Sequence, residues 1–134
     1  MRIYPDRDAF ARRLLQEDPF LTAERAAFLA AHLARETAGG LAWNGDPWHK
    51  APAPHLFRLE ESMSVWRQVS APVLWVAGRQ SWLVRDFATR PGDWEARRGC
   101  FTRVREAWIE EAGHMLHHDR PAAVARLIED FFTT

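Results

Sequence analysis

The chain has 134 residues, which is enough for one domain with a hydrophobic core but not obviously for two. Hydrophobic residues make up 47% of the chain and charged residues 27%, a balance that is typical of soluble globular proteins. Lysine plus arginine number 18, as do aspartate plus glutamate, and this balance argues against a surface of one sign that recruits nucleic acid or anionic lipid.

The single cysteine and the lack of long apolar runs argue against further classes of protein. Cys100 has no second cysteine with which to form a disulfide or a thiolate zinc cluster. No apolar run approaches the roughly 20 residues of a membrane span, and residues 1–10 are charged and lack the apolar core of a signal peptide. We therefore expect a cytoplasmic protein without a membrane span.

Residues 1–69 are typical of helices joined by proline-rich loops. Asp6 is suited to cap a first short helix, and Thr22 to cap a second one that ends at Gly39-Gly40. The second helix is marked by apolar residues at helical spacing: Ala26, Leu29, Ala30, Leu33 and Ala34. A loop over residues 41–54 follows, and a third helix is marked by Leu59, Met63 and Trp66.

Residues 70–134 have a different period. The continuous apolar run of residues 73–77 ends at Gly78, as expected for a strand covered on both faces. A second, weaker strand is predicted around residues 105–111, with Ala107 and Ile109 on one face. Residues 82–99 between them are long enough for a crossover helix, although Pro91-Gly92 interrupts its pattern.

The chain ends in a segment with strong helical periodicity. The apolar residues that carry it are Val124, Leu127, Ile128, Phe131 and Phe132. Asp119 is suited to cap this helix, and Pro121 suits its first turn. The order strand, crossover, strand, helix predicts a parallel α/β layout.

Three of the six histidines, His114, His117 and His118, lie within five residues just before this helix. Parallel sheets bind ligands at the carboxyl ends of their strands, and His114 follows the second strand. A metal site would use these histidines with Asp119, but neighbouring histidines at a strand-to-helix turn do not easily face one ion, and no HExxH pattern accompanies them. We therefore expect no metal, with His117 and His118 either exposed to solvent or supporting the site without touching a ligand. His114 is either a functional residue or a loop histidine bonded to backbone.

The pattern resembles the C-terminal part of an α/β-hydrolase-fold protein of the esterase, lipase and epoxide or haloalkane hydrolase type. Residues 71–78 resemble the penultimate strand of that family, residues 113–121 the turn that carries its catalytic histidine, and residues 124–132 its closing helix. The segment from about residue 6 to 68, with its Asp46-Pro-Trp-His49 loop, is similar to the helical cap. The resemblance implies a cap segment over residues 1–69 and the C-terminal part of the core over residues 70–134.

The resemblance implies that His114 is the catalytic general base. In such sites a histidine removes the proton from a nucleophile, or from water where an aspartate is the nucleophile, and later returns a proton to a leaving group. Imidazole suits this task because it titrates near working pH. The resemblance implies no cofactor and no metal.

Other parts of the family's active site are missing from this sequence. No serine, cysteine or aspartate has glycine two residues away on both sides, so there is no nucleophile elbow, and an HGGG-type loop is absent as well. Within residues 78–84, Ser81 stands where the family often has its acid, and the next carboxylate is Asp86. Some members of the fold take the acid from an earlier strand.

The seven tryptophans allow two interpretations. Trp75 and Trp108 are expected to pack in or beside the sheet. The remaining candidates either pack in cores or shape an apolar pocket for an acyl or aromatic substrate: Trp43, Trp48, Trp66 and Trp82. Asp46 is expected to be a turn residue before Pro47, and a cap-lining role stays open for His49.

The sequence therefore predicts a C-terminal fragment of an α/β hydrolase that carries the catalytic histidine and no nucleophile, and that is inactive alone. A truncated gene product, a misassigned start and one half of a split enzyme all fit this pattern. The expected partners are a complementing N-terminal half or a second copy, with a small apolar ester-type substrate in the intact enzyme. The alternative is a noncatalytic α/β interaction module that dimerises or binds a partner through an exposed apolar face.

Overall fold

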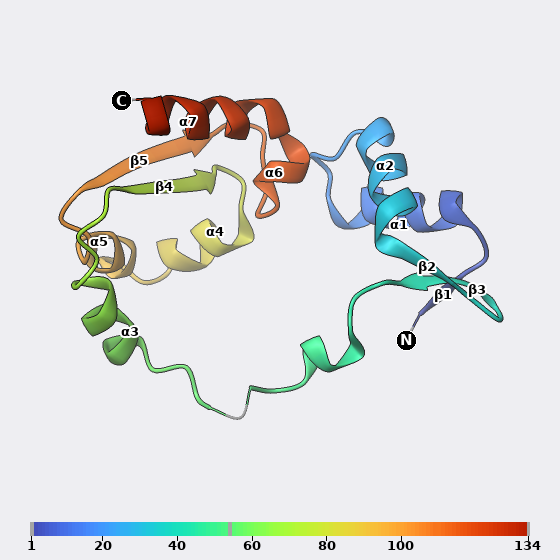
Figure 1. Cartoon of the computed structure of the whole chain (residues 1–134), viewed down its shortest axis with the longest axis horizontal. Helices are drawn as coiled ribbons and strands as arrows, with labels where there is room; N and C mark the ends of the chain where they lie inside the picture. The colour runs from blue at the N-terminus through green and yellow to red at the C-terminus, as the bar shows by residue number, and fades with distance from the viewer. Residues whose placement is uncertain (1, 54, 134) are drawn as a thin grey trace. The chain divides into compact units, whose positions relative to one another are not determined.

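The computed structural model describes residues 2–53 and 55–133, which form two compact units (Figure 1). One unit is Met1–His55 and the other is Leu56–Thr134. The division into a cap segment (residues 1–69) and a core (residues 70–134) stays a prediction, because compactness alone does not identify a cap.

The first unit combines two helices with short strands. The caps predicted for both helices are confirmed: Asp6 Oδ1 accepts a hydrogen bond from the Ala9 N–H at 2.7 Å, and Thr22 Oγ1 accepts one from the Arg25 N–H at 3.3 Å. The elements of this unit are β1 (Ile3–Tyr4), α1 (Arg7–Glu17), α2 (Ala23–Leu33), β2 (Ala34–Thr37), β3 (Gly40–Trp43) and the 3₁₀ helix η1 (Pro47–Lys50).

A β-hairpin replaces the last part of the predicted second helix, and this prediction was wrong. The helix ends at Leu33, and β2 pairs with β3 in antiparallel register, with Thr37 opposite Gly40. Strand β1 adds to β3, so the described residues of this unit form a sheet in the order β1-β3-β2. Gly40 has a φ of 129°, and a Cβ there would lie 2.3 Å from the Tyr4 carbonyl oxygen, so this corner of the sheet requires glycine.

The second unit has the predicted parallel α/β order. Strands β4 and β5 pair in parallel from Val73 opposite Val104 to Gly78 opposite Ile109. The crossover between them is two short helices, and the break that Pro91-Gly92 predicted occurs at Gly92, which has a φ of 85°. The elements are α3 (Leu59–Trp66), β4 (Val73–Gly78), α4 (Trp82–Ala88), α5 (Asp93–Arg98), β5 (Val104–Ile109), α6 (Leu116–Asp119) and α7 (Pro121–Thr133).

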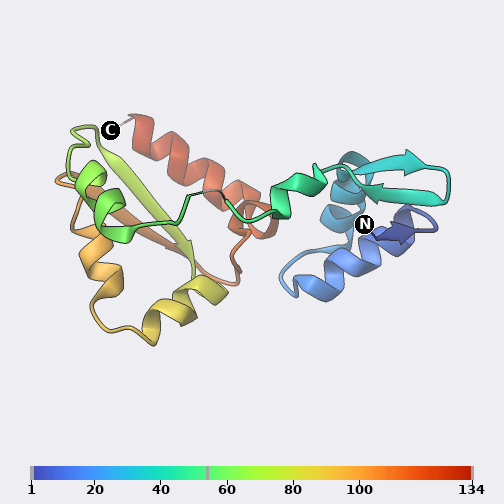
Figure 2. The same cartoon turned by 90° about the horizontal axis from the view of Figure 1, so that it is seen from below.

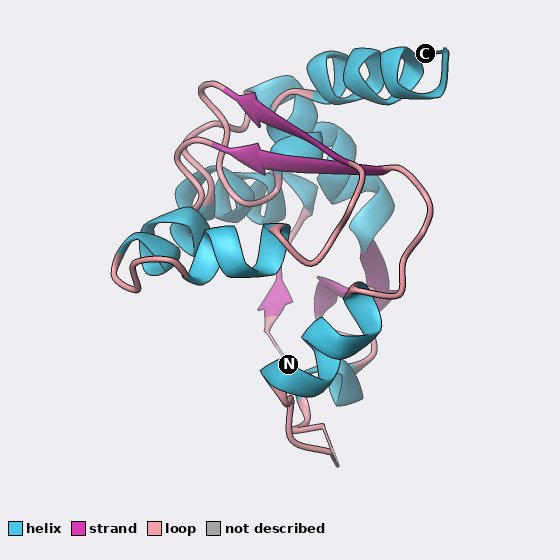
Figure 3. Ribbon diagram, turned by 90° about the vertical axis from the view of Figure 1, so that its left-hand side faces the viewer, coloured by secondary structure: helices cyan, strands magenta, loops and turns pink. Residues whose placement is uncertain are grey.

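Helices cover both faces of the β4–β5 pair. Figures 1 and 3 show α7 on one side of the strands and the α4–α5 crossover on the other. On the crossover side, Trp94 of α5 packs between Trp75 and Trp108, with both ring centroid distances at 5.2 Å. Trp75 and Trp108 therefore pack against the sheet as predicted, and this aromatic layer fastens the crossover to the strands.

Figure 2 shows the same elements from below and lets the crossover be followed from β4 to β5. Among the described residues, no helix combines the length and the apolar character that crossing a membrane requires.

Candidate functional site

The loops that follow β4 and β5 touch each other, because the two parallel strands end side by side. Gly78 closes β4, and a Cβ at this position would lie 2.2 Å from the Gly113 carbonyl oxygen and 2.5 Å from that of Ala112. Only glycine permits the backbone of the second loop to approach β4 this closely. The segment that leads into His114 is therefore seated directly on the end of β4.

Hydrogen bonds fix the same backbone. The Gln80 N–H donates to the Ala112 carbonyl at 3.0 Å, and the Ala112 N–H donates back to Gln80 Oε1 at 3.1 Å. The next N–H, of Gly113, donates to Asp119 Oδ2 at 2.7 Å. These bonds satisfy buried backbone groups and leave the peptide before His114 little freedom.

The position of Asp119 corrects a prediction. Asp119 is 0% exposed and is the last residue of α6, whereas α7 begins at Pro121 directly after Arg120. Its carboxylate accepts the Gly113 N–H, six residues earlier in the chain, and the residue directly before α7 is Arg120, not Asp119 as the sequence suggested. Asp119 therefore braces the loop that carries His114.

His114 is exposed and is held from one side by the start of α4. Its Nδ1 lies 3.2 Å from Ser81 Oγ, and Ser81 is 3% exposed. Ser81 Oγ also accepts the Leu83 N–H at 3.2 Å, as the N-cap of α4. The Trp82 ring contacts the imidazole, with a centroid distance of 4.9 Å and an interplanar angle of 51°.

This geometry gives His114 an oriented ring. When Nδ1–H donates to Ser81 Oγ, the lone pair of Nε2 is left to accept a proton, which is the state that a general base requires. With the opposite hydrogen-bond direction, the serine hydroxyl donates to Nδ1 and Nε2 carries the proton. Ser81 occupies the position in which the family often has an acid, but its neutral hydroxyl orients the imidazole without stabilising an imidazolium by charge.

The next carboxylate along the chain has a different partner. Asp86 is exposed on α4, and its Oδ2 lies 2.7 Å from Arg90 Nη2. Arg90 also binds Asp93, and hydrogen bonds from Arg97 are the main cause that holds the pKa of the Asp93 carboxyl below its usual range. This network of alternating charges joins α4 to α5, and the contact to His114 Nδ1 comes from Ser81.

The other two histidines of the cluster lie on α6. The rings of His117 and His118 contact each other with a centroid distance of 4.2 Å, and His117 is exposed. Within residues 2–53 and 55–133, no three histidine, cysteine, aspartate or glutamate side chains gather in a way that could hold a metal ion.

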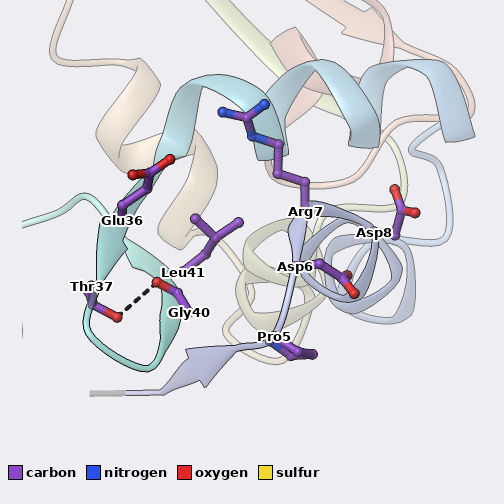
Figure 4. A pocket seen from close by; sticks show the side chains of 8 residues that line it. All are labelled: Pro5, Asp6, Arg7, Asp8, Glu36, Thr37, Gly40 and Leu41. Carbon is purple, nitrogen blue, oxygen red and sulfur yellow. Dashed lines mark hydrogen bonds between the residues drawn. The ribbon is translucent and has the colours of Figure 1, made fainter.

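The first unit also contains hollows. Figure 4 shows one at the start of α1, where the side chains are engaged in local structure: Asp6 caps α1, and Thr37 Oγ1 donates to the Gly40 carbonyl at 2.9 Å. It is lined by Pro5, Asp6, Arg7, Asp8, Glu36, Thr37, Gly40 and Leu41. These residues include no histidine, cysteine or serine that could serve as a base or nucleophile.

Asp46 and the tryptophans that were candidates for a substrate pocket lie in different local environments. Asp46 is a turn residue as predicted, because its Oδ1 accepts the Trp48 N–H at 2.9 Å at the start of η1. Trp48 itself is 80% exposed, and Trp66 stacks on Phe101 with a centroid distance of 6.1 Å. Trp82 is the tryptophan that contacts His114.

Sequence reasoning found His114 and Ser81 but missed the residues that fix the His114 loop. Gln80 and Asp119 lie 32 and 6 residues from their backbone partners, Ala112 and Gly113. Gly78 was recognised as the end of a strand, and nothing in its immediate sequence indicates which backbone lies against it.

Comparisons with known proteins identify the fold of this chain. No protein-family model and no curated protein matches the chain. Among solved structures, the thioesterase domain from the curacin biosynthetic pathway is 27% identical, with a TM-score of 0.77 over 96% of this chain and 44% of that one. An esterase of Mycobacterium tuberculosis is 19% identical, with a TM-score of 0.77 over 99% of this chain and 43% of that one.

A third match is to E-2-(acetamidomethylene)succinate hydrolase, which is 18% identical, with a TM-score of 0.77 over 99% of this chain and 47% of that one. The chain thus spans less than half the length of the structures that it matches. The chain has the α/β-hydrolase fold and resembles the C-terminal part of proteins with that fold, as the sequence predicted.

Proposed function

We propose that His114 is the general base of a hydrolase site that cleaves an ester or a thioester, and that a segment outside these 134 residues supplies the nucleophile. The observation that carries this proposal is the contact of His114 Nδ1 with Ser81 Oγ at 3.2 Å, on the loop that follows a parallel strand. A fixed Nδ1 directs Nε2 away from α4, toward the exposed side on which a nucleophile could approach.

In this reaction Nε2 of His114 removes the proton of the nucleophile as it attacks the acyl carbon, and donates that proton to the alcohol or thiol that leaves when the ester or thioester bond breaks. The same Nε2 then takes a proton from a water that hydrolyses the acyl-enzyme, and returns it to the nucleophile. Acyl transfer also needs donors for the developing oxyanion, and no nucleophile elbow or HGGG-type loop occurs in the sequence. The 134 residues alone are therefore expected to form no acyl-enzyme. A complementing N-terminal hydrolase half, in the same polypeptide or in a partner, is the proposed source of both groups.

The surroundings of His114 favour an apolar substrate. Trp82 is 57% exposed beside the imidazole, and Met115, the residue after it, is also exposed. Apolar groups next to a base accommodate an apolar leaving group or acyl chain better than a charged one. We extend the proposal to residues 1–69 as the cap of this site, on the strength of the Asp46-Pro-Trp-His49 loop, and to a cytoplasmic location, which the single cysteine supports.

The test starts with the DNA immediately upstream of the Met1 codon. We expect it to encode, in frame, a Gly-x-Ser-x-Gly or Gly-x-Asp-x-Gly elbow. A protein that joins this upstream segment to the 134 residues should hydrolyse a p-nitrophenyl ester, whereas the 134 residues alone should not react with a fluorophosphonate probe. Fluorophosphonate labelling of Ser81 in the short chain would refute the assignment, because the nucleophile would then lie within it.

A noncatalytic interaction module is the second candidate. Most side chains of β4 and β5 are only partly buried, and large apolar side chains such as Val65 and Phe132 are exposed in the same unit. Exposed apolar surface of this kind is typical of a face that associates. A folded chain that forms a stable dimer in sedimentation experiments, from a gene without an upstream elbow, would favour this candidate over the hydrolase.

A further inference from the structure

We propose that the first unit contains a second binding site, for a small uncharged aromatic molecule, in a cavity between β1, α1 and the segment that follows β3. The site is separate from the loops around His114, and it lies within the segment proposed as the cap, because Asp46 and His49 belong to the Asp46-Pro-Trp-His49 loop. The cavity is lined by Arg2, Tyr4, Phe10, Leu14, Glu17, Trp43, Gly45, Asp46, Pro47 and His49.

The size of the cavity is suited to a small molecule, and its lining offers aromatic contacts. The cavity has a volume of about 720 Å³, within the roughly 300–1,000 Å³ of small-molecule sites. Two aromatic rings, Tyr4 and Trp43, present partly exposed surface to the cavity, and Phe10 packs behind them: Tyr4 and Phe10 have a centroid distance of 4.7 Å, and Phe10 and Trp43 one of 5.7 Å at an angle of 82°. The exposed parts of the Tyr4 and Trp43 rings are left for another ring to contact.

The aromatic residues of the cavity differ in how far they are exposed to solvent. Phe10 is 1% exposed and belongs to the core of the unit, whereas Trp43 at the end of β3 is 44% exposed. The backbone of Gly45 runs against the Trp43 indole, because a Cβ at Gly45 would lie 2.4 Å from Trp43 Nε1. Glycine at this position therefore lets the indole fold over the following segment and serve as one side of the cavity.

The charges at the cavity favour an uncharged ligand. The Arg2 guanidinium lies 5.4 Å from the centroid of the Tyr4 ring. Two carboxylates also line the cavity, and both have partners: Glu17 is paired with Arg13, and Asp46 Oδ1 accepts the Trp48 N–H. His49 and the Tyr4 phenol are the remaining titratable groups of the lining, so charges of both signs are present beside groups that are neutral in one of their forms. A hydroxyl on the ligand can still find donors and acceptors there.

The experiment follows 2-naphthol binding to the ¹⁵N-labelled 134-residue chain by NMR. We expect saturable shifts of the Trp43 indole signal, which is identified by its loss in Trp43→Ala. Trp43→Ala should weaken binding at least tenfold. The matched control is Trp48→Ala, which removes a nearby tryptophan that is 80% exposed and does not line the cavity, and which should bind as the unmodified chain does.

Two further comparisons make the test specific. Gly45→Ala keeps every aromatic ring but displaces the indole, so it should also weaken binding, and it replaces Trp43→Ala if that variant fails to fold. Decahydro-2-naphthol, which has the same carbon skeleton without aromatic rings, should bind several-fold more weakly. Equal effects of Trp43→Ala and Trp48→Ala, equal binding of the saturated compound, or no saturable shift would each overturn the proposal.

Discussion

The two compact units of the chain use different interactions to build their candidate sites. In Leu56–Thr134, hydrogen bonds from Gln80, Ser81 and Asp119 converge on the loop of His114 and orient one reactive ring. In Met1–His55, aromatic rings line a cavity, and the nearby carboxylates are engaged in caps and ion pairs. In the proposed hydrolase site, polar contacts fix the position of one ring, and in the proposed aromatic-binding site, apolar packing forms the wall.

The largest expected effect tests whether the His114 loop depends on backbone contact with β4. Gly78→Ala places a Cβ into the carbonyl oxygens of Ala112 and Gly113, and should lower the free energy of unfolding of the second unit by about 3 kcal/mol. Urea unfolding measures the loss. The Trp43 indole NMR signal should stay unchanged, since the first unit is not touched.

Gly39→Ala is the control, because its Cβ would meet Ile3 Cγ2 at 3.7 Å, an ordinary contact. If Gly78→Ala and Gly39→Ala had equal, small effects, the close approach of the two loops would not exist in solution.

The next effect concerns Asp119, the buried residue that holds the loop of His114. Asp119→Ala removes the acceptor of the Gly113 N–H and leaves that donor buried, which should cost about 1–3 kcal/mol of unfolding free energy. Asp119→Asn keeps a side-chain oxygen that can accept the same N–H and should lose less. Amide exchange at Gly113 distinguishes the two variants: it should accelerate strongly in Asp119→Ala. Unchanged Gly113 exchange in both variants would show that Asp119 does not hold the loop.

A smaller effect is expected when the residue that orients His114 is given a negative charge. Ser81→Asp puts a carboxylate beside Nδ1, and because an adjacent negative charge favours the imidazolium, the pH at which the ring titrates should rise by about 1 unit. Aspartate also remains a good N-cap for α4. NMR titration of the imidazole measures the shift, with Ser70→Asp as an exposed control in the same unit. A titration unaffected by Ser81→Asp would mean that Ser81 and His114 are not in contact.

The smallest effect lies in the ion-pair network that joins α4 to α5. Arg97, and then Arg90, hold the pKa of Asp93 below its usual range, so the ionised form is stabilised in the folded state. This contribution is complete above about pH 4, the unfolded-state range of aspartate, and is lost as the pH falls through the lower folded-state pKa. The stability difference between the unmodified chain and Asp93→Asn should therefore be present at pH 7 and shrink below pH 4. A pH-independent difference would contradict the shift.

Local patterns predicted most of the fold. The apolar run before Gly78, the caps at Asp6 and Thr22 and the helical period of the last segment are properties of neighbouring residues, and all were confirmed. The β2–β3 hairpin was missed because residues 34–37 do not alternate between buried and exposed positions. The two central residues of this strand are exposed, and the two outer ones are half-buried. Gly39-Gly40 was read as a helix stop, whereas the structure has a two-residue hairpin turn at Ala38-Gly39 between the paired residues Thr37 and Gly40.

The site was predicted only in part, for the same reason. Ser81 was identified by its place after the strand, but its contact with His114 joins residues 33 positions apart, which no periodicity reports. The role of Asp119 was misjudged because a carboxylate just before a helix predicts a cap, and here burial and a backbone N–H inside the preceding loop compete successfully for it.

The most direct measurement is the ester turnover of the protein that joins the upstream-encoded segment to these 134 residues, compared between His114→Ala and His117→Ala. His117 is an exposed histidine three residues away and serves as the matched control. We predict that His114→Ala lowers kcat by about 10³-fold or more with little change in fold, and that His117→Ala leaves kcat unchanged. Full turnover in His114→Ala would contradict the assignment of His114 as the general base.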